Sequence, residues 1–80
     1  MDILQLKRKI EPLGFSIGFE EPSPTIIMRN YEDGNEYKLK EIVSNENFYN
    51  QIMTSKKLSL DFLMSFFMRY DEPIENGVDL

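Results

Sequence analysis

The sequence contains no cysteine and no histidine among its 80 residues, and each absence excludes a class of chemistry. Without cysteine the chain forms no disulfide and offers no thiolate to a metal ion. Without histidine it lacks the commonest general base and the usual ligand of zinc, copper and non-haem iron. We therefore expect no metal site, no other cofactor, and a core built from hydrophobic side chains alone.

No other arrangement of residues typical of catalysis is present. None of the serines lies in a nucleophile elbow. Adjacent acids such as Glu20 and Glu21 point apart on a strand or turn, so they seldom form a two-carboxylate site. The glycines do not form a phosphate-binding loop, and no aspartate-rich loop has the spacing of calcium ligands. We expect a protein that is not an enzyme and has no catalytic residues.

Long hydrophobic runs are also missing. The most apolar stretch, residues 58–70, is interrupted by serine, aspartate and arginine and is too short to span a bilayer. The basic residues at positions 7–9 follow apolar residues, which is the reverse of the order in a signal peptide. We expect a cytoplasmic protein, located in the host cell cytoplasm if the chain is encoded by a phage.

Basic charge is scarce, with 14 acidic side chains against 9 basic ones and a formal net charge of −5. A nucleic-acid binder needs a basic surface to displace counterions from phosphates, and an anionic membrane attracts basic segments. We therefore expect no direct binding of nucleic acid or membrane. A basic patch on another protein matches this charge better, although acidity also serves solubility alone.

Three segments of the chain have the pattern of helices. Apolar residues at helical spacing predict the first helix over residues 2–12. A second follows at about residue 45, and a third ends before Pro73. The candidate N-caps of the three helices are Asp2, then Ser44 or Asn45, then Ser59 or Asp61.

Three segments between the first two helices have the pattern of strands. Alternating or β-rich stretches predict strands over residues 15–19, 25–31 and 36–42. Prolines separate the first two, and Asp33-Gly34 is a hairpin turn between the second and third. Short connections between sequential strands predict an antiparallel meander.

These elements follow one another in the order α-β-β-β-α-α. They predict an α+β domain in which helices cover one face of a three-stranded antiparallel meander. We assign this domain to residues 1–72. The last residues, 73–80, contain acids and no base, and we expect them to form a flexible acidic tail.

The third predicted helix is more apolar than one buried face requires. A helix packed on a sheet needs about three or four apolar residues in two turns, and most residues from 58 to 70 are apolar. One interpretation is that the sheet and the second helix enclose it from two sides. The other is that Phe62, Phe66 and Arg69 form an interface for dimerisation or for another protein. Monomer and homodimer both remain open.

The turn between the second and third strands is the other candidate site. It consists of Glu32, Asp33, Gly34, Asn35 and Glu36. Its residues are good turn formers, and its acids could serve solubility only. Alternatively, a rigid hairpin presents three carboxylates at one point, where they bind arginine side chains through bidentate hydrogen bonds. If those arginines normally read DNA, the turn competes with DNA.

The stretch Ile26 to Tyr37 resembles the central hairpin of a family of small acidic phage anti-CRISPR proteins. That family inhibits the type II-A RNA-guided nuclease. Its hairpin has an arginine four residues before an Asp-Gly-Asn-Glu-Tyr run, as Arg29 stands to Asp33 here. The family has an N-terminal amphipathic helix, a three-stranded antiparallel meander and two C-terminal helices. The similarity covers about residues 1–43.

The resemblance implies a DNA mimic. In the family, turn residues enter the pocket whose arginines read the short motif beside the target, and further acids follow the path of the duplex backbone. The matching turn positions are Asp33, Gly34, Asn35 and Glu36. The family carries its further acids along its last two helices, whereas this chain is apolar there.

Acids reappear in this chain only beyond the apolar segment, and the first three of them are Asp71, Glu72 and Glu75. We therefore expect a phage-encoded anti-CRISPR inhibitor that blocks target-DNA recognition by a type II CRISPR nuclease through the turn and these acids. The alternative is a phage or mobile-element accessory protein that dimerises, or binds a host protein, through the apolar third helix.

Overall fold

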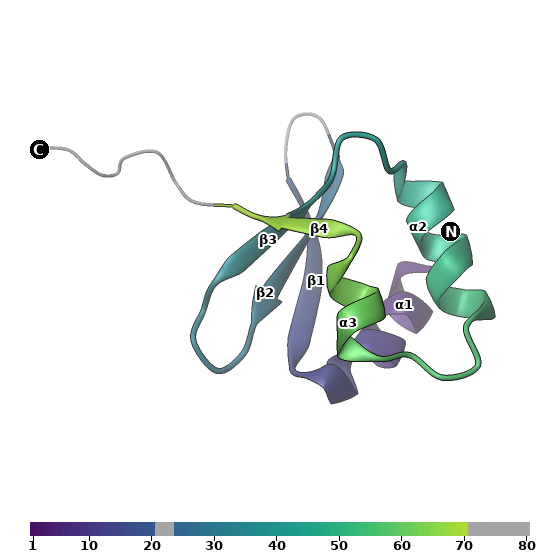
Figure 1. Ribbon diagram of the computed structural model, residues 1–80, viewed down its shortest axis with the longest axis horizontal. Coiled ribbons are helices and arrows are strands. Elements are labelled where there is room, and N and C mark those ends of the chain that lie inside the picture. Colours follow the sequence, from purple (N-terminus) through teal and green to yellow (C-terminus); the bar gives the residue numbers. More distant parts are fainter. Residues whose placement is uncertain (21–23, 71–80) are drawn as a thin grey trace, which may run out of the picture.

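The chain folds into two layers, an antiparallel sheet and a layer of helices on one side of it (Figure 1). The computed structural model describes residues 1–20 and 24–70. The elements in chain order are α1 (Ile3–Ile10), the 3-10 helix η1 (Glu11–Leu13), β1 (Phe15–Glu20), β2 (Thr25–Asn30), β3 (Glu36–Leu39), α2 (Asn45–Thr54), α3 (Leu60–Met64) and β4 (Phe67–Arg69). The predicted α+β class is confirmed.

Side-chain caps fix the starts of the three α-helices. The side chains of Asp2, Ser44 and Ser59 each accept a hydrogen bond from the backbone N–H three residues further on, at 3.2, 3.0 and 3.1 Å. Each cap satisfies one of the N–H groups that a helix start leaves unpaired. Gly14 ends η1 with φ of 93°, a left-handed conformation that glycine adopts at little cost. The predicted first helix is thus α1 followed by η1.

The two faces of the sheet differ in what covers them. Residues directly opposite each other in an antiparallel pair lie on the same face, so the register assigns each residue to a face. Met28 lies opposite both Ile17 and Tyr37, and this set faces the helices. Arg29 lies opposite Ser16 and Glu36 on the other face, which no helix covers in the described part of the chain. The expected division into a covered and a wetter face is therefore present.

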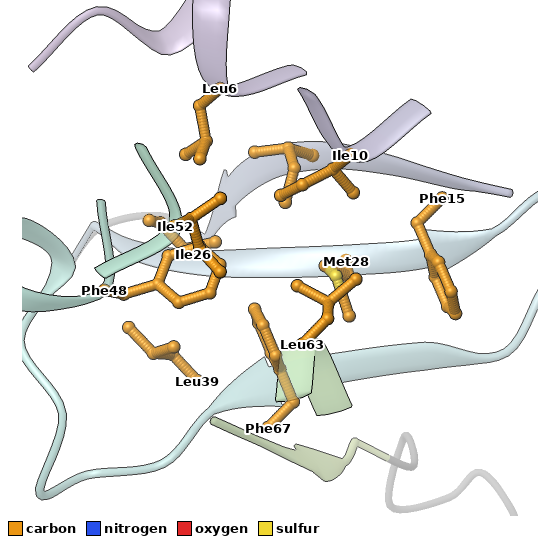
Figure 2. Close-up of a cluster of buried hydrophobic side chains, with 11 residues drawn as sticks. Leu6, Ile10, Phe15, Ile26, Met28, Leu39, Phe48, Ile52, Leu63 and Phe67 are labelled. Carbon is orange, nitrogen blue, oxygen red and sulfur yellow. The ribbon is translucent and has the colours of Figure 1, made fainter. Parts of the chain in front are cut away.

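The core lies between the sheet and the helices and contains only hydrophobic side chains. No polar or charged residue is buried in the described part of the chain. Both layers contribute, as Figure 2 shows, and the buried set is Leu6, Ile10, Phe15, Ile17, Ile26, Met28, Leu39, Phe48, Ile52, Leu63 and Phe67. Burial of this apolar surface is the main favourable term in folding.

Phe48 of α2 lies at the centre of the contacts between the helix layer and the segment that follows α3. Its ring is fully buried and meets the rings of Phe66 and Phe67 edge-on, at centroid distances of 5.3 and 5.1 Å. Edge-on aromatic pairs add about 0.5–1.5 kcal/mol beyond the burial of their area. Through these contacts α2 holds the segment that follows α3 against the sheet.

The predicted long third helix is wrong, and the predicted three-stranded meander, which β1, β2 and β3 form, gains a fourth strand. Helix α3 ends at Met64, where the Ser65 hydroxyl donates to the Phe62 carbonyl oxygen at 2.6 Å. The chain then forms β4, in which Phe67 lies opposite Leu39 of β3. A continued helix would leave apolar side chains on its outer face. A fourth strand instead pairs the outer edge of β3 and suits residues that favour sheets.

The third strand is also shorter than predicted. Beyond its end, the side chain of Asn45 bonds to the backbone at the start of β2. Strand β3 stops at Leu39, and Ile42, which the sequence placed in the strand, is 91% exposed. The Asn45 side chain accepts a hydrogen bond from the Ile26 N–H at 3.2 Å and donates one to the Pro24 carbonyl at 3.0 Å. It therefore fastens the start of α2 to the start of β2. The predicted tail, residues 73–80, lies outside the described residues.

Replacing Phe48 with alanine should lower the free energy of unfolding by about 3–5 kcal/mol. The substitution leaves a cavity and removes both edge-on contacts. Urea denaturation followed by circular dichroism measures the change. Ile42→Ala is the control, because its exposed side chain should contribute within about 0.5 kcal/mol. Equal losses from the two substitutions would contradict a core centred on Phe48.

Candidate functional site

The turn between β2 and β3, residues 30–35, is held by five hydrogen bonds, and we call it the hairpin tip. The Asn30 side-chain oxygen accepts from the N–H groups of Glu32 and Asp33, at 2.7 and 3.3 Å. The Asp33 carboxylate accepts from the Asn35 N–H at 2.8 Å. Backbone bonds of 2.9 Å join Asn30 to Gly34 and Asn35. Gly34 supplies the left-handed residue, with φ of 75°. The tip is therefore a fixed loop.

The hairpin tip exposes two carboxylates, and a third from a distant segment lies beside it. Glu32 and Asp33 are both exposed. The Tyr31 ring is 60% exposed, and its hydroxyl donates to a carboxylate oxygen of Glu11 at 3.5 Å. Glu11 belongs to η1, so the fold brings it to the tip across 20 positions of sequence. Sequence reasoning missed it because no local pattern relates the two segments.

An arginine of β2 and an arginine of β4 bring positive charge to the base of the tip. Glu36 forms an ion pair with Arg29, whose Nε also donates to it at 3.0 Å. Arg69 of β4 donates to the side-chain oxygen of Asn35 at 3.2 Å. Of the five turn residues predicted from the sequence, the structure thus gathers four at the tip. It places Glu36 on the uncovered face of the sheet, against Arg29.

The charge of the chain is unevenly divided between described and undescribed residues. All nine basic side chains and nine of the 14 acidic ones lie in residues 1–20 and 24–70, so this part carries no formal net charge. The net charge of −5 therefore corresponds to the five remaining acids, which are Glu21, Asp71, Glu72, Glu75 and Asp79. The predicted partner-binding residues Asp71, Glu72 and Glu75 lie outside the described residues.

The predicted interface on the third helix does not exist as one helical face. Phe62 lies on α3 and is 36% exposed, whereas Phe66 follows the helix and packs edge-on against Phe62 and Phe48. Arg69 lies on β4 and contacts Asn35. The prediction that these three residues lie on one face of a helix is wrong because α3 ends at Met64. Of the apolar residues in the segment 58–70, Leu63 and Phe67 are buried in the core, whereas Leu60, Phe62 and Met68 are exposed.

A polar cluster on the uncovered face of the sheet joins segments far apart in sequence. The Tyr70 hydroxyl donates to the Glu20 carboxylate at 2.8 Å, and the Lys38 ammonium lies 3.1 Å from the other oxygen of that carboxylate. Lys38 also lies 5.4 Å from the centre of the Tyr70 ring. The hydrogen bond from Tyr70, and after it Lys38, lowers the pKa of Glu20 below its ordinary value of 4.5. Both partners favour the charged carboxylate.

The part of the chain that the structure describes has neither a metal-binding cluster nor a membrane-spanning helix. No group of three or more acidic side chains there could hold a metal ion. No helix of residues 1–20 and 24–70 is long and apolar enough to cross a membrane. Comparison of the chain with protein-family models, with curated proteins and with solved structures gave no match.

The Glu20 cluster should make the free energy of unfolding depend on pH in the acidic range. Because the pKa of Glu20 is lower in the folded protein, its stabilising contribution is complete above the unfolded pKa and is lost as pH falls through the folded pKa. The stability difference between the wild type and Glu20→Gln should therefore shrink between about pH 7 and about pH 3. Urea midpoints at both pH values measure it. A difference that stays constant would show that the cluster does not hold the charged carboxylate.

Proposed function

We propose that this protein is a binding protein that inhibits a nucleic-acid enzyme by inserting its hairpin tip into an arginine-lined site that reads DNA. The observation that carries this proposal is the fixed geometry of the tip. Five internal hydrogen bonds hold the loop that exposes Glu32 and Asp33. A loop already ordered in the free protein loses little conformational entropy when it binds.

The chemistry of the exposed acids suits arginine. A carboxylate accepts two parallel hydrogen bonds from the guanidinium fork, and such charge-assisted pairs are stronger than neutral ones. Asp33 uses one carboxylate oxygen for the Asn35 N–H, and a carboxylate has further acceptor sites for an arginine. Glu11, beside Tyr31, adds a third acid at the edge of the same surface.

The first candidate partner is a type II CRISPR nuclease, which the resemblance of the hairpin favours. Arginines of that class of nuclease read the short motif beside the target by bidentate bonds to guanine. Glu32 and Asp33 would occupy the same forks and exclude the DNA. The protein would thus block target recognition in the cytoplasm of a host cell, as a phage-encoded anti-CRISPR inhibitor.

The division of charge favours two separate roles for the acids. The described residues carry no formal net charge, and two arginines lie at the base of the tip, so an extended imitation of the duplex backbone by the folded body is not favoured. The tip would supply the specific contacts. The acids Asp71, Glu72 and Glu75 would supply long-range attraction, which acts mainly on the association rate.

Changing Glu32 and Asp33 together to lysine should weaken binding to the guide-loaded nuclease by at least about tenfold, since charge-assisted hydrogen bonds contribute about 1.5–3 kcal/mol each. Biolayer interferometry at two salt concentrations measures the affinity. Target DNA with its adjacent motif should compete with the wild type. The matched control is Glu41→Lys with Glu46→Lys, which makes the same change in net charge at two other exposed positions.

Two results would contradict this proposal. Normal cleavage of target DNA at saturating concentrations of the wild type would exclude inhibition of that nuclease. Equal weakening by the tip variant and by the control variant would show that net charge, and not the geometry of the hairpin tip, determines binding.

A further inference from the structure

Strand β1 has one edge that pairs with no other strand of residues 1–20 and 24–70, and backbone groups at that edge point away from the sheet. The order β1-β2-β3-β4 places β1 at one end. The Tyr31 N–H donates to the Gly14 carbonyl at 2.9 Å, which fixes the alternation of hydrogen bonds between β1 and β2. In an antiparallel pair every second residue bonds to the neighbouring strand. The residues whose N–H and C=O groups point outward are therefore Phe15, Ile17 and Phe19.

This edge lacks the features that usually prevent strands from pairing with other chains. Exposed edge strands are commonly very short, or carry charge or proline. The opposite edge fits that rule, since β4 has three residues and ends in Arg69. Strand β1 has six residues, and its first five, Phe15 to Phe19, contain no charge and no proline. Glu20 is the one charged residue, at its end.

We propose that the β1 edge pairs with the β1 edge of a second copy of this chain, antiparallel and around a two-fold axis at Ile17. The proposal is independent of the function proposed above. Ile17 then faces Ile17 of the second copy, and Phe15 faces Phe19 of the second copy. Three such pairs exchange about six backbone hydrogen bonds. The two sheets become one sheet of about eight strands, twice the four of one copy.

The register explains the exposure of Phe19. Its side chain is on the same face as Ile17 and Phe15, which are 5% and 4% exposed, yet it is 39% exposed itself. In the paired sheet each Phe19 lies beside Phe15 of the second copy, and aromatic cross-strand pairs stabilise a sheet. The pairing thus covers the apolar side chain at the end of β1 that the single chain leaves in solvent.

The register also avoids steric and electrostatic conflict on the uncovered face. Ser16 lies opposite Gly18 of the second copy, and no atom lies within 4 Å of the position that a Cβ at Gly18 would occupy. Glu20 falls opposite Gly14 of the second copy, so the two Glu20 carboxylates do not meet. Like charges directly opposite would destabilise the pair. The second copy therefore meets no repulsive group along β1.

The test introduces charges at Ser16 and Gly18, which lie opposite each other across the line where the two β1 strands meet, here called the seam. In Ser16→Glu with Gly18→Glu, like carboxylates stand opposite across the seam, and in Ser16→Lys with Gly18→Lys, like ammonium groups do. The open space at Gly18 allows both variants to fold, which circular dichroism verifies. Size-exclusion chromatography with light scattering should give a dimer for the wild type and a monomer for each variant. An equimolar mixture of the two variants should form a dimer again.

Met68→Lys is the matched control, because Met68 is 54% exposed and lies on the same face at the opposite edge of the sheet. This variant should stay dimeric. The lysine variant at the seam has a smaller net negative charge than the wild type, so its dissociation cannot result from overall repulsion. A monomeric wild type at the highest concentration would overturn the proposal. Variants that remain dimeric, or a monomeric Met68→Lys, would also overturn it, since both place the interface elsewhere.

Discussion

The contact between Phe48 and the segment after α3 is the constraint on which the rest of the structure depends. Phe48 is fully buried on α2 and meets Phe66 and Phe67 edge-on. These contacts hold β4 where its backbone can pair with β3. Strand β4 in turn carries Arg69 to the base of the hairpin tip, where it donates to Asn35. A core contact between helix and strand is thus connected, through one added strand, to the loop proposed to bind a partner.

The parts of the fold that the sequence predicts are those set by local chemistry. Caps at Asp2, Ser44 and Ser59 act within three residues, and the Asp33-Gly34 turn acts within the hairpin. The segment after α3 is different. Its aromatic and methionine residues fit either a helix or a strand in isolation, and the choice depends on the open edge of β3, which lies almost thirty positions earlier in the chain. The periodicity of the segment itself contains no information about that edge.

The candidate site also has one part that local chemistry determines and another that the packing of separate elements determines. Turn chemistry is enough to predict that Glu32 and Asp33 are exposed at the tip of a hairpin. Glu11 beside the tip and the pairing of Glu36 with Arg29 depend on how separate elements pack, and no spacing in the sequence reveals the first of them. The described residues carry no formal net charge, so the acidic composition of the chain does not make this part of it acidic. Acidity belongs to particular positions in this chain and not to its whole surface.

Hydrogen–deuterium exchange of the free protein and of the protein bound to a guide-loaded type II CRISPR nuclease tests the role of the hairpin tip most directly. The N–H groups of Glu32, Asp33 and Asn35 are bonded to side chains within an exposed loop, so they report contacts made there. We predict that exchange slows most at residues 30–35 on binding, with little change along α1. Protection confined to α1, or no protection at the tip in a stable complex, would contradict a partner-binding hairpin.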